Sequence, residues 1–348
     1  MAFVHGGSAE CAKSELDIFQ LAPTQTSVEK SFYIEVPPLT ALTENAPLEF
    51  YVAGNGEDYL DLNNTLLYLT CKITEADGRD IDAAARVSLV NYPIAAIFSQ
   101  VDITVGDRLI SQSNNCYPYR AFIESVLNYS EETLKTQYST GLFYKDTAGE
   151  HESTILDGPN QGFRKRASYT TQSRKLELLG HIHADLFFQD KLLLNGLPKV
   201  VILGFVDNAA FSGSFTQNPF NFKHYNVNFL ALYADGEQIP TKPLQPDFQN
   251  GHCVREYFNL VETAGKRLKD KPVLVDREEY ARGYTLFAFN LSPDDECTGH
   301  YSLIKSGNLR AEIRFATPLP TTVNMVVYAL FDNVIELDMR RQVIYDFS

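Results

Sequence analysis

Two histidines that alternate along one segment are the residues best suited to metal chemistry in this sequence. His181 and His183 would lie on the same face of a β-strand, about 6.6 Å apart, so both imidazoles could reach one metal ion. Asp185 would stand about 13 Å from His181, too far to complete a shell whose ligand distances are ~2 Å. A cupin-type site would also need a glutamate soon after the histidines, and none occurs between Glu177 and Glu237. His181 and His183 are therefore weak candidates, and we expect a polar strand face or a subunit contact there.

Other catalytic motifs are incomplete. His151-Glu152 begins like a zinc-protease motif, but Ile155 stands where the second histidine must be. The five cysteines are odd in number and widely separated, with no C-x-x-C pair to indicate zinc or a redox centre. We therefore predict no catalytic residue, no cofactor and no metal. Because no secretory signal is visible, we expect a protein kept inside the cell, with no disulfide among Cys11, Cys71, Cys116, Cys253 and Cys297.

The charge of the chain argues against nucleic acid as the main partner. With 30 Lys+Arg against 44 Asp+Glu, the net charge is −14, whereas phosphate binding needs clustered, uncompensated basic residues. Three short clusters could contact nucleic acid or an acidic partner, and we interpret them as solvated loops: 164–166, 266–269 and 340–341. The apolar run at 199–206 is far shorter than the ~20 residues that span a bilayer. We expect no sequence-specific nucleic-acid binding and no membrane span.

Short strands bounded by turn residues are the main structural signal. From 67 to 73, apolar residues at every second position predict a half-buried strand. Residues 97–110 alternate in the same way and turn at Gly106-Asp107, which predicts a hairpin. A second hairpin is predicted where 227–233 meets Asp235-Gly236. Three further strands are predicted at 284–290, 309–315 and 323–331.

One stretch has helical instead of strand spacing. Apolar residues recur at three- and four-residue intervals from 120 to 138, Ser130 can cap a second helical segment, and Glu131 can pair with Lys135. We therefore predict a helical insertion over 118–140. Residues 1–47 are rich in proline and poor in strand signal, which is typical of an extended arm.

Composition and length indicate a folded chain of two packed units. Of the 348 residues, 44% are hydrophobic and 21% are charged, which excludes intrinsic disorder and a long coiled coil. A chain of this length exceeds the size of one typical core. Many short strands without regular βαβ alternation predict an all-β fold of antiparallel sandwiches.

Several segments resemble one known family. They are SELDIF at 14–19, PTQTSV at 23–28, YLDL at 59–62, LGFVDN at 203–208, NPFNF at 218–222, YADGEQIP at 233–240 and VYALFDN at 327–333. These blocks are similar to the hexon-like major capsid proteins of Polinton/Maverick elements and adintoviruses, and the similarity extends over nearly the whole chain. The resemblance implies a tandem (double) jelly roll, with an N-terminal arm at 1–47, a first roll at 48–196 that carries the helical insertion, and a second roll at 197–348.

The resemblance also implies a function. The chain would be a structural capsid subunit, not an enzyme, that forms homotrimers with a pseudo-hexameric outline in the virion shell. Its partners would be copies of itself, neighbouring capsomers, and penton and minor capsid proteins. Two other functions fit the residues: a jelly-roll module that binds carbohydrate or protein, and a cupin-like metal enzyme built on His181 and His183.

The chain departs from this family at one place. Family members carry a longer stretch between the counterparts of DKLLLNG at 190–196 and LPKVV at 197–201, and here the two blocks are adjacent. In the family that stretch ends the first roll and begins the second. We therefore expect either tandem rolls that both lack strands near residue 196, or one composite sandwich that has closed across this junction.

Overall fold

The computed structural model describes residues 28, 30–41, 46–54, 60–106, 108–111, 115–182, 197–266, 272–292, 307–331, 336–337 and 343–344. They fall into two units that divide after Leu62. In the N-terminal unit, the described residues before the 3₁₀ turn η2 (Leu62–Asn64) form no helix or strand. Phe32, Tyr33 and Ile34 expose 59%, 75% and 56% of their surface. Residues 1–27 of the predicted arm lie outside the described part.

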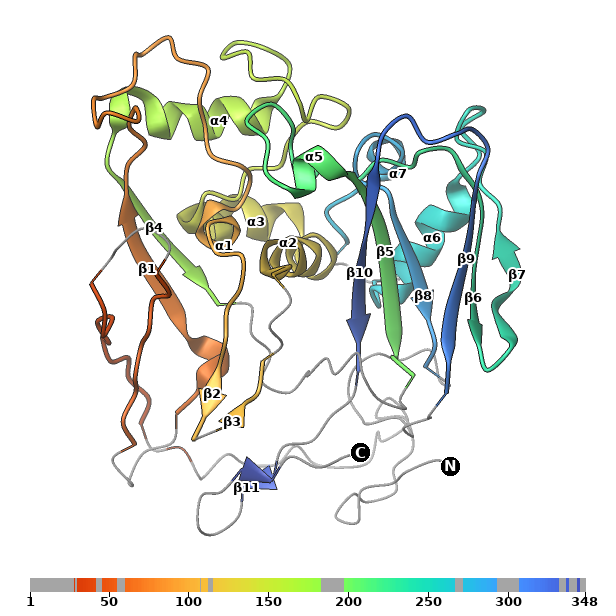
Figure 1. Ribbon diagram of the computed structural model, residues 1–348, viewed down its shortest axis with the longest axis horizontal. Helices are drawn as coiled ribbons and strands as arrows, with labels where there is room; N and C mark the ends of the chain where they lie inside the picture. Colours follow the sequence, from red (N-terminus) through yellow and green to blue (C-terminus); the bar gives the residue numbers. More distant parts are fainter. Residues whose placement is uncertain are drawn as a thin grey trace. The chain divides into compact units, whose positions relative to one another are not determined.

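Two antiparallel sheets of three strands form the C-terminal half of the main unit (Figure 1). One has the order β10-β5-β8, and the other has the order β7-β6-β9. The strands are β5 (Val200–Asp207), β6 (Val227–Ala234), β7 (Glu237–Leu244), β8 (Leu286–Asn290), β9 (Leu309–Phe315) and β10 (Val323–Leu330). The helices α5 (Asn208–Phe211), α6 (Val254–Thr263) and α7 (Arg277–Tyr280) connect them.

Strand β5 is buried on both faces, which explains its unbroken run of apolar residues. Val201, Leu203 and Phe205 belong to the core between the two sheets, together with residues of β6, β7 and β8. The alternate residues Ile202 and Val206 belong to a second core that contains the helices. A strand that is buried on both faces has apolar residues at successive positions, instead of alternating apolar and polar residues.

Helices and two short sheets make up the N-terminal half of the main unit. The helical elements are α1 (Pro93–Ala96), α2 (Tyr117–Asn128), α3 (Glu131–Thr136), η3 (Gln137–Gly141), α4 (Gln161–Thr170) and η4 (Thr171–Ser173). Strand β1 (Leu66–Cys71) pairs with β4 (Leu176–His181), and β2 (Thr104–Val105) pairs with β3 (Arg108–Leu109). Outside this half, later in the sequence, β11 (Glu336–Leu337) pairs with β12 (Val343–Ile344).

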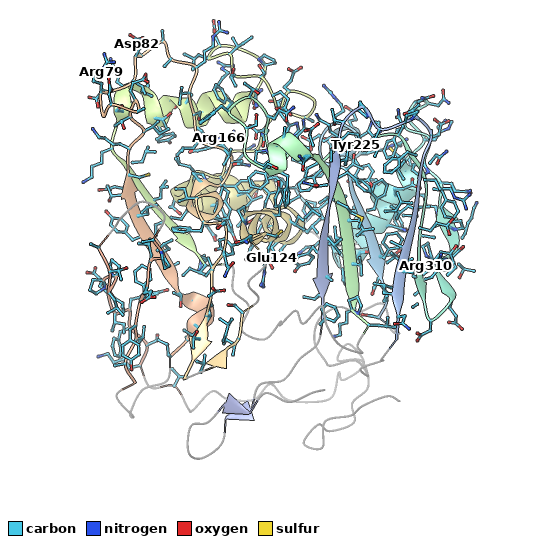
Figure 2. The ribbon with its side chains drawn as sticks, viewed as in Figure 1. Arg79, Asp82, Glu124, Arg166, Tyr225 and Arg310 are labelled. Atoms are coloured by element: carbon cyan, nitrogen blue, oxygen red, sulfur yellow. The ribbon has the colours of Figure 1, made fainter. Side chains whose placement is uncertain are left out.

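Helix α2 joins the two halves through its apolar face. The ring of Phe122 stacks on that of Phe220, with centroids 4.3 Å apart and planes 4° from parallel. On the polar side, the Tyr328 hydroxyl of β10 lies 3.3 Å from Glu124 Oε1 of α2, and Glu124 is labelled in Figure 2. Residues before 180 and after 200 therefore share one core.

Most predicted elements are confirmed. Both hairpins form, and at the second one Asp235 and Gly236 have φ of 50° and 89°, the positive values that a tight primed turn requires. The helical insertion is present, the Ser130 side chain accepts a hydrogen bond from the Thr133 amide, and Lys135 pairs with Glu131 at 2.6 Å.

The all-β prediction holds for the sheets and misses the helices outside the predicted insertion. The chain is largely β with antiparallel sheets, but α1, α4, α5, α6 and α7 lie outside residues 118–140. Helix α6 packs Leu260 into the helix-side core, with Tyr257 and Val261 against it. No helix in the described part of the chain is long and apolar enough to cross a membrane.

Candidate functional site

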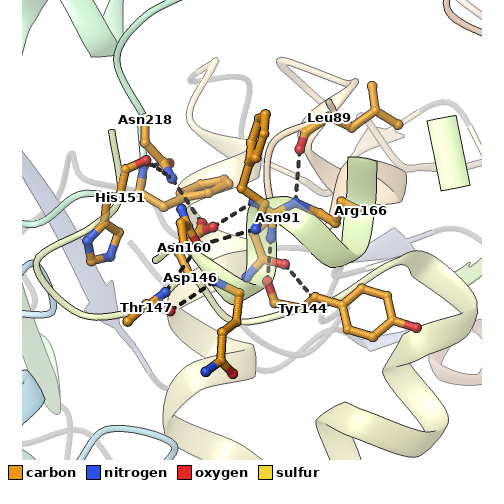
Figure 3. Close-up of polar contacts among 12 residues, drawn as sticks. Leu89, Asn91, Tyr144, Asp146, Thr147, His151, Asn160, Arg166 and Asn218 are labelled. Carbon is orange, nitrogen blue, oxygen red and sulfur yellow. Dashed lines mark hydrogen bonds and ion pairs between the residues drawn. The ribbon is translucent and has the colours of Figure 1, made fainter. Parts of the chain in front are cut away.

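A buried ion pair between Arg166 and Asp146 is the centre of the polar network in Figure 3. Arg166 lies on α4, where it shares the buried face with Phe163, Ala167 and Thr170 at helical spacing. The Asn160 side chain caps this helix by accepting a hydrogen bond from the Phe163 amide at 3.2 Å. The guanidinium therefore projects toward the core instead of into solvent.

Helix α4 approaches the preceding loop closely. A Cβ atom on Gly162 would lie 2.4 Å from the carbonyl oxygen of Lys145, a separation that real structures do not show. The lack of a side chain at residue 162 thus brings the start of α4 against the segment that carries Asp146.

The ion pair is fully buried and well satisfied. Arg166 Nη2 lies 2.7 Å from Asp146 Oδ1, and both side chains are 2% exposed. Arg166 Nε donates to the Leu89 carbonyl at 2.9 Å, and Nη1 donates to the Tyr144 carbonyl. These bonds offset the cost of removing both charges from water, which attraction between the charges alone would not do reliably.

Asp146 also connects the network to the sandwich half of the unit. Its Oδ2 accepts a hydrogen bond from Asn218 Nδ2 at 2.9 Å, and its backbone carbonyl accepts one from the Tyr284 hydroxyl at 2.6 Å. Tyr284 is fully buried, and burial is the main reason that its pKa is raised well above the usual value. The phenol is therefore a permanent donor at neutral pH.

Two asparagines fix the backbone around the pair. Asn91 Oδ1 accepts hydrogen bonds from the amides of Tyr144 and Tyr92, at 2.8 and 2.9 Å. Asn160 Oδ1, besides capping α4, accepts one from the Thr147 amide at 3.2 Å. Both side chains are 1% exposed. Residues 144–147 are thus held by side chains from segments on either side in the sequence.

Among the described residues, His151 is the one buried imidazole beside this network. It is 6% exposed, its ring lies 4.8 Å from the Tyr284 ring, and neither ring nitrogen has a hydrogen-bond partner among the described residues. Burial is the main cause that lowers its pKa to about 4, with Lys145, Lys223 and Arg166 adding to the effect and Asp146 opposing it. His151 is therefore neutral at physiological pH.

The arrangement is suited to holding segments together and lacks the parts of an acid–base or nucleophilic centre. Arginine does not exchange protons at neutral pH, and both Asp146 side-chain oxygens accept hydrogen bonds from the protein. Within the described part of the chain, no hydroxyl, thiol or carboxylate forms a hydrogen bond with the His151 ring nitrogens. We interpret the network as a clamp that joins α4, the loop after η3 and the sandwich.

The residues singled out from sequence lie elsewhere. His181 is exposed at the last position of β4, and His183 falls outside the described residues, so the predicted spacing of the two rings is not tested. Among the described residues, no three His, Cys, Asp or Glu side chains group as a metal site would need. In the described part of the chain, no disulfide joins Cys71, Cys116 or Cys253, and burial raises the pKa of each, whereas Cys11 and Cys297 are not described.

One basic cluster was interpreted wrongly. Residues 164–166 are helical and not a loop, and Arg166 is buried in the clamp. Most of the 266–269 cluster, and the whole 340–341 cluster, lie outside the described residues. The sequence did contain a signal for Arg166, because Phe163, Arg166, Ala167 and Thr170 follow the spacing of one helix face. No sequence pattern predicts that Asp146 and Asn218 belong to the same network as Arg166.

Comparison with known proteins gives one distant relative and no family. The chain is 24% identical to the uncharacterized protein F54H12.2 of Caenorhabditis elegans, over an alignment that includes 93% of this chain and 99% of the relative. That alignment has 425 positions, whereas 93% of 348 residues is about 324, so about 100 positions have no counterpart here. No family model and no solved structure matches the chain.

Proposed function

We propose that this protein is a structural subunit that self-associates, and specifically a capsid subunit of the double jelly-roll type. The observation that carries the proposal is where the family-like segments fall. LGFVDN occupies β5 and the start of α5, YADGEQIP forms the β6–β7 turn with its flanking strands, and VYALFDN begins in β10. The resemblance thus concerns framework strands of the sandwich and not surface loops alone.

The packing of a fourth family-like segment points the same way. NPFNF lies between α5 and β6, and its Phe220 and Phe222 are 2% and 0% exposed in the helix-side core. The amide of Phe222 donates to the Gly283 carbonyl at 2.9 Å, and the amide of Thr285 donates to the Phe222 carbonyl at 3.0 Å. Because these contacts connect the helices to the sheet, we infer a structural role for this segment.

The finer fold belongs to the same proposal. A jelly roll has eight strands in two sheets, and β5 to β10 supply six in two sheets of three. About 100 positions of the alignment with the Caenorhabditis elegans relative have no counterpart here, which supports a shortened copy of the double roll. The proposal places the missing strands near residue 196.

Light scattering coupled to size exclusion, followed by electron microscopy of the peak fractions, tests the proposal. We expect a trimer of three 39.2 kDa chains, and larger shells or shell fragments at high concentration. The double variant His181→Gln/His183→Gln serves as a control and should assemble equally well, because assembly needs no metal at these residues. A monomer at every concentration would contradict the proposed function. Stoichiometric metal that the double variant loses would favour the metal-enzyme alternative.

A further inference from the structure

Two segments of this acidic chain contain basic residues and no acidic ones. Residues 83–101 and 158–176 together hold six of the 30 basic residues and none of the 44 acidic residues. The rest of the chain carries 24 basic and 44 acidic residues, a net charge of −20. A surface built from the two segments is therefore opposite in sign to the rest of the molecule.

The fold brings these two segments together. Arg166 of α4 donates to the carbonyl of Leu89, and the Ile81 amide, just before the first segment, donates to Ser173 Oγ at 2.9 Å. Figure 2 labels Arg79 and Asp82 at the start of the loop that runs over α4. We call the exposed side chains of residues 86–90 and 164–175 the α4 surface.

The charges of the α4 surface are available to a partner. Arg166 is neutralised by Asp146, whereas Arg86, Arg164, Lys165, Arg174 and Lys175 are exposed and form no ion pair in the described part of the chain. Lys165 Nζ lies 5.9 and 5.8 Å from the ring centroids of Tyr144 and Tyr169. The two rings hold that ammonium group in place without cancelling its charge.

Apolar side chains share this surface, which indicates the class of the partner. Val87, Val90 and Tyr169 expose 40%, 37% and 39% of their surface. Aliphatic side chains add little to the binding of a phosphate backbone, whereas arginine, tyrosine and apolar residues together are typical of protein interfaces. The mixture favours an acidic protein surface over nucleic acid.

We propose that the α4 surface docks on the acidic surface of a second copy of this chain. The rest of the chain, at −20, supplies the complementary charge, so no other partner is required. This inference rests on the self-association proposed above and names one surface that produces it. Because the contact joins opposite charges across a partly apolar patch, salt weakens it and removal of the charges weakens it further.

Sedimentation equilibrium at 50 and 500 mM NaCl tests the proposal on the full chain. The variant Arg164→Gln/Lys165→Gln/Arg174→Gln/Lys175→Gln removes four charges from the α4 surface. A matched control removes the same number elsewhere with Lys135→Gln/Lys242→Gln/Arg277→Gln/Arg310→Gln. Circular dichroism melts establish that both variants fold.

At 50 mM NaCl we expect the α4-surface variant to associate at least about tenfold more weakly than the wild type, and the control within about threefold of it. Raising the salt to 500 mM should weaken self-association of the wild type about tenfold, and that of the α4-surface variant much less. Equal association of variant and wild type would overturn this inference and leave self-association standing. A wild type that is monomeric in both buffers would overturn both proposals.

Short duplex DNA of random sequence, titrated in the same buffers, separates the other partner class. We expect no binding that differs between the α4-surface variant and the control. DNA binding that only the α4-surface variant loses, with self-association unchanged, would assign the surface to nucleic acid instead.

Discussion

Removing the charge of Asp146 should destabilise the fold strongly, because it leaves Arg166 charged and unpaired in the core. Both side chains are 2% exposed, so neither charge can regain water without local opening. Breaking such a pair by replacing one partner costs about 3–5 kcal/mol, and Asp146→Asn should fall at the lower end because the amide keeps the shape. Urea unfolding gives the measurement, followed by far-UV circular dichroism and by tyrosine fluorescence, since the chain has no tryptophan.

The exposed pair of Lys135 and Glu131 provides the control. Its charged atoms are 2.6 Å apart, close to the 2.7 Å of the buried pair, but its side chains are 67% and 61% exposed. Glu131→Gln should therefore change stability by no more than about 0.5 kcal/mol. The double variant Asp146→Asn/Arg166→Met should lose at least about 1 kcal/mol less free energy of unfolding than the two single variants lose together. Strict additivity, or an Asp146→Asn cost no larger than that of Glu131→Gln, would refute the clamp.

Acid should weaken the fold through His151. Burial lowers the pKa of His151 from 6.5 to about 4, so the unfolded chain binds the proton at a higher pH than the folded chain does. The free energy of unfolding should therefore fall by about 3 kcal/mol as the pH is lowered from 6.5 to 4. In urea unfolding, the variant His151→Gln should show a smaller change over this pH range. A Cβ on residue 283 would lie 2.3 Å from the His151 ring, so Gly283→Ala should lower Tm by at least about 5 °C, and an unchanged Tm would contradict the contact. Removing residues 1–47 should leave Tm within about 2 °C and weaken contacts between oligomers, whereas a collapse of stability would make the arm part of the core. Mass spectrometry of unreduced protein should find all five cysteines as thiols, and one internal cross-link would contradict this.

The elements that could be predicted from the sequence are those whose pattern of residue types is determined by neighbouring residues. The β6–β7 turn needs two residues with positive φ, and Asp235-Gly236 is a pair that provides them cheaply. Strand β1 alternates because its Leu67 and Leu69 pack against the core while Tyr68 is 61% exposed. In both cases the nearest neighbours in sequence determine the conformation.

Elements defined by distant partners were missed. Helix α4 has few apolar residues, and the long side chain of Arg166 fills a core position only because Asp146 and two carbonyl groups meet it there. Asn218 reaches Asp146 from 72 residues away. Local spacing cannot report such a pairing. Helix α6 differs, since Tyr257, Leu260, Val261 and Ala264 show regular helical spacing that the strand-dominated interpretation overlooked.

The position of α2 has a consequence for folding during synthesis. Its apolar face is covered by β10, which ends at Leu330, about 200 residues after α2 ends at Asn128. At about 5–20 residues per second, a ribosome needs about 10–40 s to make that interval. During this time the nascent chain carries a finished helix that still lacks its contacts with β10. Early binding of a chaperone to residues 117–128 would protect that face until the last strand of the sandwich emerges.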